Sequence, residues 1–137
     1  MRLVLDTNVY IAAFLQKGLA SDILILGEER KVDLFISPEI IKEIEEKLDK
    51  KFKVDKDRIG KFIDVVKRST EQVTPFKKIY VIKVDPDDNM ILECVVEAKA
   101  DLIVSMDKHL LKLKSYEGTG IVHTKTLTWI IPKFFEN

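Results

Sequence analysis

Compact apolar runs alternate along the chain with stretches in which apolar residues recur every three or four positions. The apolar runs predict buried strands over residues 3–5, 34–36, 80–82, 102–104 and 121–123. Helical periodicity is clear over residues 40–48, 59–66 and 91–98. Strands that alternate with helices are typical of a parallel α/β fold. We therefore expect a central, mainly parallel sheet of about five strands.

Polar residues that precede the helical stretches predict where the helices begin. Serine, threonine, asparagine and aspartate side chains can accept the first free N–H groups of a helix. The expected caps are Thr7 or Asn8, Ser21 or Asp22, Ser37 ahead of Pro38, the acids of 85–88, and Thr124 or Thr126. The second helix is expected to run through Arg30, residues 109–111 are expected to form a single turn, and Pro132 should end the last helix.

Aspartates stand at the ends of two predicted strands and at the start of one predicted helix. Asp6 follows the first strand, and Asp107 lies just past the strand 102–104. Asp88 lies three residues before Ile91, on the apolar face of its helix. Parallel α/β sheets bind ligands beyond the carboxyl ends of their strands. Burying several carboxylates together is costly, so we expect a cation among these three aspartates.

Length and composition restrict the class of protein. A chain of 137 residues with 46% hydrophobic residues is expected to form one globular domain over 1–137. Because 23 basic residues balance 23 acidic residues, binding to nucleic acid would depend on local patches. One basic run comprises Lys47, Lys50, Lys51, Lys53 and Lys56. We interpret this run as a solvated face, with an RNA-contacting edge as the alternative.

The sequence lacks the marks of several other classes. It contains no glycine-rich phosphate loop and no dinucleotide-binding fingerprint. His109 and His123 do not have the spacing of zinc ligands, and the single cysteine, Cys94, excludes an internal disulfide framework. Because we find neither an apolar run of membrane-spanning length nor a signal peptide, we expect a cytoplasmic protein without a membrane partner.

Three segments together resemble the PIN-domain nucleases. The first is Asp6-Thr7-Asn8 after the first strand, the second begins with Asp85-Pro-Asp-Asp-Asn and continues through residues 92–94, and the third covers residues 101–107. The likeness extends over nearly the whole chain and is closest to the VapC-like toxins of prokaryotic toxin–antitoxin pairs. It implies a three-layer α/β/α sandwich that cleaves single-stranded RNA in a metal-dependent reaction.

The resemblance also assigns roles to individual residues. The four acids of the family fall on Asp6, Glu43, Asp88 and Asp107, which would be the catalytic and metal-binding residues. Glu43 is preferred by family position alone, because Glu39, Glu45 and Glu46 share its helix. Asn8 and Ser105 would orient the carboxylates, while Asp85 and Asp87 would cap the helix or orient the site. An all-carboxylate site implies Mg²⁺ or Mn²⁺.

The expected partners are single-stranded RNA, an antitoxin protein and a second copy of the chain. The terminal run from Trp129 to Phe135 is rich in large apolar residues and should pack on the core or on that second copy. Two other interpretations remain open. The chain could be a PIN nuclease of housekeeping RNA processing, or a catalytically silent PIN-like module that binds RNA or protein.

Overall fold

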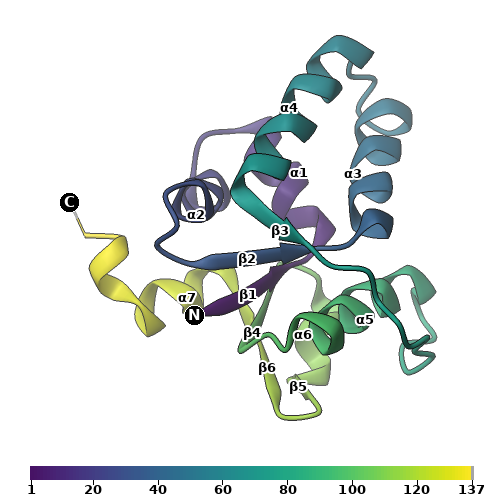
Figure 1. The fold of residues 1–137 in the computed structure, drawn as a ribbon, viewed down its shortest axis with the longest axis vertical. Coiled ribbons are helices and arrows are strands. Elements are labelled where there is room, and N and C mark those ends of the chain that lie inside the picture. Colours follow the sequence, from purple (N-terminus) through teal and green to yellow (C-terminus); the bar gives the residue numbers. More distant parts are fainter. Residues whose placement is uncertain (137) are drawn as a thin grey trace.

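The central sheet has six strands in a computed structural model that describes residues 1–136 (Figure 1). The strands are β1 (Arg2–Leu5), β2 (Asp33–Ile36), β3 (Thr70–Gln72), β4 (Leu102–Ser105), β5 (Ser115–Tyr116) and β6 (Thr119–His123), in the spatial order β3-β2-β1-β4-β6-β5. Neighbouring strands are parallel except β5, which pairs antiparallel with β6. The expected mainly parallel sheet is confirmed, with six strands where the sequence predicts about five.

The order of the strands explains why helices cover both faces of the sheet. The connections from β1 to β3 step in one direction and carry α1 (Thr7–Leu15), α2 (Leu19–Glu28), α3 (Pro38–Lys50) and α4 (Lys56–Ser69). The next connection returns across β1 to β4 and carries the short helix η1 (Pro86–Asp88) and α5 (Asn89–Ala98). Right-handed crossovers therefore place α5 on the face opposite the first four helices (Figure 1). The result is an α/β/α sandwich.

The core forms where the central strands are covered on both faces. Leu3, Val4 and Leu5 of β1 are fully buried, as the continuous apolar run predicts for an inner parallel strand. On α3, the predicted stripe of Ile40, Ile41, Ile44 and Leu48 is buried, and the Ser37 hydroxyl accepts the Ile40 N–H at 3.3 Å. This cap fixes the start of α3 beside the carboxyl end of β2.

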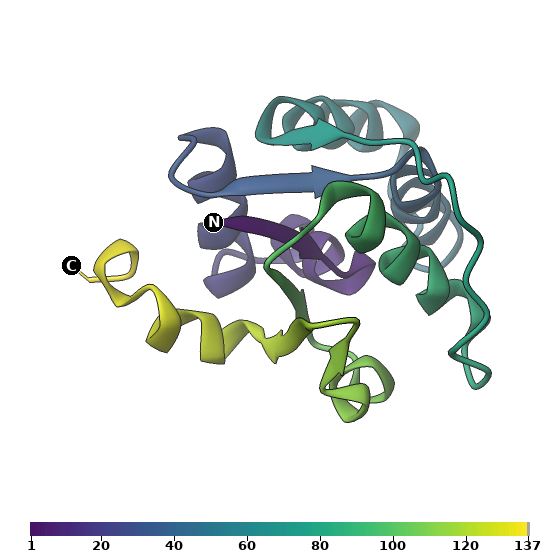
Figure 2. The same cartoon turned by 60° about the horizontal axis from the view of Figure 1, so that its bottom comes forward.

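Residues 80–82 do not form the strand that their apolar character predicts. They lie in an extended connection, residues 73–85, which we call the strap and which runs beside α5 (Figure 2). The backbone N–H of Ile79 donates to the Glu93 carboxylate at 2.9 Å, and that of Ile82 donates to the Asn89 amide at 2.8 Å. Side chains of α5 therefore replace a neighbouring strand, and β3 occupies the edge of the sheet.

Several helix ends also differ from the sequence predictions. Asp6 precedes α1 without a side-chain capping bond, and α2 begins at Leu19 and ends at Glu28. The remaining helices are α6 (Lys108–Leu113), α7 (Thr124–Ile130) and the short η2 (Pro132–Phe134). His123 caps α7, because its Nδ1 accepts the Lys125 N–H at 3.1 Å, so neither predicted threonine is the cap.

Within residues 1–136, no single helix has both the length and the apolar character needed to cross a membrane. The pair α1 and α2 reaches the required length and composition only when the two are taken together, and the chain bends by 104° between them. Much of this pair lies in the core, where Val9, Tyr10 and Ile23 are fully buried.

Candidate active site

Ser105 connects the two aspartates that follow the central strands. β1 and β4 are parallel neighbours, and the Asp6 N–H donates to the Val104 carbonyl at 2.9 Å. The buried Ser105 hydroxyl donates to Asp6 Oδ2 at 2.9 Å and accepts the backbone N–H of Asp107, also at 2.9 Å. One hydroxyl thus contacts both strand-end segments, which is the geometry that the expected orienting role requires.

Asp107 also caps the start of α6. Its Oδ1 accepts the N–H groups of His109 at 2.7 Å and Leu110 at 3.1 Å, which begins α6. Asp107 is half-buried. Capping fixes the orientation of the carboxylate and uses Oδ1, which leaves Oδ2 as the oxygen that could face a ligand.

Asp88 holds the least satisfied carboxylate of the site. The residue is only 7% exposed, and its Oδ2 is buried with no hydrogen-bond partner among the described residues. The neighbouring acids behave differently: Asp85 is exposed and accepts the N–H of Asp87 at 3.2 Å, which caps η1. The prediction that Asp85 caps this helix start is confirmed, whereas Asp88 faces inward. An unpaired buried oxygen of this kind is expensive and indicates a missing cationic or donor partner.

The pKa shifts show that the acids share one electrostatic environment. Burial raises the pKa of Asp6 from 3.8 to about 6; the Ser105 hydrogen bond lowers it, and the charge of Asp107 raises it. Burial also raises the pKa of Asp88 from 3.8 to about 7, and the charges of Asp107, Asp6, Asp85 and Glu43 add to the increase. The charge of Asp107 raises the pKa of both Asp6 and Asp88, and the charges of Asp6 and Glu43 raise that of Asp88, so Asp6 and Asp88 each lie within electrostatic range of other candidate acids.

Glu43 reaches this environment from α3, together with a lysine that the sequence interpretation placed on a solvated face. Lys47 Nζ lies 3.4 Å from Glu43 Oε1 and donates to Asn8 Oδ1 at 3.2 Å. The charge of Lys47 lowers the pKa of Asp6. The interpretation of the basic run was therefore wrong for Lys47. Its spacing of four residues from Glu43 was the available signal, because i and i+4 side chains share a helix face.

The burial of the α3 glutamates helps to choose among them. Glu45 and Glu46 are exposed, whereas Glu39 and Glu43 are half-buried on the same flank. Glu43 affects the pKa of Asp88, whereas Glu39 affects that of Cys94, further along α5. Of the four glutamates of α3, Glu43 is therefore the one whose charge reaches Asp88.

The side chains fit a divalent cation by their chemistry rather than by preformed coordination. Within residues 1–136, no three or more acidic, histidine or cysteine side chains are grouped closely enough to hold a metal ion as they stand. The donors that converge are carboxylate oxygens, which hard cations such as Mg²⁺ and Mn²⁺ prefer. The free Oδ2 of Asp88 is the clearest acceptor for such an ion.

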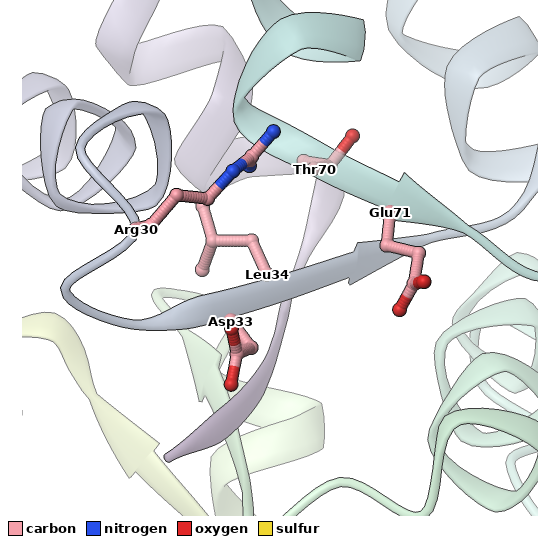
Figure 3. A pocket seen from close by; sticks show the side chains of 5 residues that line it. All are labelled: Arg30, Asp33, Leu34, Thr70 and Glu71. Atoms are coloured by element: carbon pink, nitrogen blue, oxygen red, sulfur yellow. The ribbon is translucent and has the colours of Figure 1, made fainter.

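A separate hollow lies at the amino-terminal end of β2 and β3, away from the acids. It is lined by Arg30, Asp33, Leu34, Thr70 and Glu71. Figure 3 shows the Arg30 side chain on one side of β2 and the Asp33 and Glu71 side chains on the other. The Arg30 guanidinium already donates to two backbone carbonyls. Because its charged groups do not converge, this hollow is a weaker candidate site than the acids.

Comparison with known families identifies the class of the chain. A family model described as PIN domain matches residues 2–109, a segment that includes all four candidate acids. No curated protein sequence matches the chain. The family match covers most of the chain, and its fold is the α/β/α sandwich described above. The chain therefore belongs to the PIN-domain family.

Proposed function

We propose that this chain is a metal-dependent endoribonuclease that cleaves single-stranded RNA by attack of water on the phosphodiester. Membership of the PIN-domain family supports the proposal, because PIN domains are generally nucleases that use divalent metal ions. The observation that carries the proposal is the buried Oδ2 of Asp88, which has no hydrogen-bond partner within residues 1–136 and lies near the charges of Asp107, Asp6 and Glu43. The buried carboxylates lower the stability of the metal-free protein, and a cation bound between them would offset this cost.

We assign the metal to Asp6, Asp88 and Asp107, with Glu43 holding a coordinated water or acting as the base. A bound Mg²⁺ or Mn²⁺ supplies a water of lowered pKa and offsets the charge that develops on the phosphate.

The surrounding residues hold the carboxylates in place and partly oppose the effect of burial on Asp6. The Ser105 hydroxyl donates to Asp6, which favours the charged form of that carboxylate. Asn8 accepts from Lys47, whose ammonium group also pairs with Glu43. Lys47 therefore restrains Glu43 and adds a positive charge at the margin of the acids.

The biological role that we propose is that of a toxin held by a separate antitoxin protein, with the active chain as a homodimer. The support comes from the resemblance of the acid-bearing segments to VapC-like toxins. A neutral formal charge is compatible with docking to a second protein chain. A nuclease of housekeeping RNA processing would use the same acids and a different partner. A silent binding module would have no reason to retain the complete acid set.

Digestion of defined single-stranded RNAs tests the proposal. We expect the purified protein to cut RNA with Mg²⁺ or Mn²⁺, and to stop in excess EDTA or as the Asp6→Asn variant. Glu43→Gln should reduce the rate, while Glu45→Gln, a change of the same kind on an exposed position of α3, should not. Cutting that persists in EDTA or in Asp6→Asn would contradict a metal-dependent mechanism at these residues.

A further inference from the structure

The outer side of the strap, residues 73–85, displays aromatic and basic side chains together. Phe76 is 91% exposed and Tyr80 is 78% exposed, and Lys77, Lys78 and Lys83 are exposed beside them. Residues 73–84 contain these three lysines and no acid, in a chain whose formal charge is zero. Two large aromatic rings that are this exposed and only four positions apart indicate a binding surface.

The inner side of the strap is fixed by a regular set of hydrogen bonds to α5. Backbone N–H groups of Phe76, Ile79 and Ile82 donate to side chains of Glu97, Glu93 and Asn89, at 3.0, 2.9 and 2.8 Å. The acceptors are spaced by four residues on one helix face, and the strap runs beside this face (Figure 2). Glu93 and Glu97 of α5 thus bind the strap backbone instead of facing solvent beside the lysines. The same hydrogen bonds fix the backbone that carries Phe76 and Tyr80 before any ligand binds.

The strap leads directly to the candidate active site. It ends at Asp85, whose carboxylate caps η1, and η1 ends at Asp88. A chain molecule lying along the strap would therefore approach the acids from the side of α5. The exposed ring of Trp129 has no such connection to the acids, because it lies on α7, in a different part of the fold.

We propose that the strap is the track on which single-stranded RNA lies, with bases stacking on Phe76 and Tyr80 and phosphates contacting Lys77 and Lys83. This inference rests on the proposed ribonuclease function and assigns it a substrate surface. Aromatic rings interleaved with lysines along an extended backbone match the alternation of bases and phosphates in a single strand. A protein partner on the same rings would have to desolvate the neighbouring lysines, which is unfavourable.

The test uses the full chain and a fluorescein-labelled oligouridylate of about 12 nucleotides, within the range that such surfaces occupy. Affinity is measured by anisotropy in EDTA and as the KM of cleavage with Mn²⁺. Phe76→Ala and Tyr80→Ala should each weaken binding by roughly 5-fold to 100-fold. Phe52→Ala, which removes an exposed ring just after α3, is the control and should leave binding unchanged.

Salt dependence provides a second readout that a structural defect would not change. Lys83→Ala should lower the slope of log affinity against log salt by about 0.7, the value for one phosphate of a single strand. Lys50→Ala, in the other basic run, should not. An equal effect of Lys50→Ala would overturn the assignment to the strap.

The outcomes distinguish this inference from the proposed function. RNA cleavage with unchanged affinity in the Phe76 and Tyr80 variants would overturn the strap and leave the nuclease intact. If the protein neither binds nor cuts RNA, both fail. If the same variants change the oligomeric state in sedimentation and leave RNA affinity unchanged, the strap is a protein interface and the inference is wrong.

Discussion

Asp88 and Asp87 are neighbours in sequence with opposite environments. Asp87 is exposed, while Asp88 is buried and holds an oxygen without a partner in the described part of the chain. Burial, followed by the charges of Asp107 and Asp6, raises the pKa of Asp88 to about 7. A single position in the sequence thus separates an ordinary surface acid from one that is costly to ionise.

The pH dependence of stability follows from this raised pKa. Between about pH 4 and pH 7 the folded, metal-free protein keeps a proton on Asp88 that the unfolded chain has lost, so its stability falls as pH rises through this window. Asp88→Asn has no such proton to lose, so this fall of stability with rising pH should be absent in the variant. We expect its free energy of unfolding, relative to wild type, to increase by about 1–3 kcal/mol between the two ends of the window.

Urea unfolding in EDTA at several pH values measures this difference. Asp87→Asn is the control, because its side chain is exposed, and its difference from wild type should stay nearly constant with pH. A relative stability of Asp88→Asn that fell as pH rose would contradict the raised pKa and the buried position of this acid.

A second prediction for a single residue concerns the effect of Ser105 on RNA cleavage. Ser105→Ala removes the donor to Asp6 and the acceptor for the Asp107 N–H, so the two strand-end acids lose their shared contact. We expect Mn²⁺-dependent RNA cleavage to fall by about 10-fold or more, the usual effect of removing a group that orients a ligand. Ser105→Thr retains the hydroxyl and should restore most of the rate; an inactive Ser105→Thr with normal folding would argue against this role.

At the scale of elements, the part of the strap nearest the acids is held by Asn89 of α5. Asn89 accepts the Ile82 N–H at 2.8 Å and donates to the carbonyls of Ile82 at 2.8 Å and Pro86 at 3.1 Å. Asn89→Ala should lower the free energy of unfolding by about 1–3 kcal/mol. Hydrogen exchange at the amide of Ile82 should become faster, while that of Val104 in β4 should not. Unchanged protection at Ile82 would show that the strap is held by other contacts.

The same element explains where the prediction from sequence succeeds and where it fails. Inner strands such as β1 and β4 are buried on both faces, and their apolar runs identify them directly. Residues 80–82 have the same apolar character, yet the hydrogen bonds that decide their conformation come from Asn89 and Glu93. A local pattern does not contain these long-range contacts, so the strap could not be distinguished from a strand.

The acids show a similar division. Asp6 and Asp107 could be placed from the sequence, because strand ends in a parallel sheet meet at one edge. The choice of Glu43 among four glutamates required the packing of α3 against α5, which leaves Glu45 and Glu46 exposed. The contact between Lys47 and Asn8 joins separate segments, so the spacing of Lys47 from Glu43 is its only sign in the sequence. The cap that Asp107 makes with the N–H groups of His109 and Leu110 is local, and an aspartate directly before a helix is its sign.

At the scale of the whole molecule, the proposed homodimer has a candidate surface on α7. Phe134 and Phe135 pack partly against the core, while Trp129 is 82% exposed and Ile130 is 40% exposed. We expect the wild type to sediment as a dimer at micromolar concentration and Trp129→Asp to shift it toward the monomer, because a charge in an apolar interface is unfavourable. A monomeric wild type would remove the dimer from the proposal.

The central claim is that Asp6, Asp88, Asp107 and Glu43 act together as one divalent-cation site. Titration of the metal-free protein with Mn²⁺ in a calorimeter tests it most directly. The account predicts binding to wild type and to Asp87→Asn with similar affinity, and binding to Asp88→Asn that is at least about 10-fold weaker, a difference of about 1.4 kcal/mol. Equal affinity of Asp88→Asn and wild type for Mn²⁺ would contradict the site.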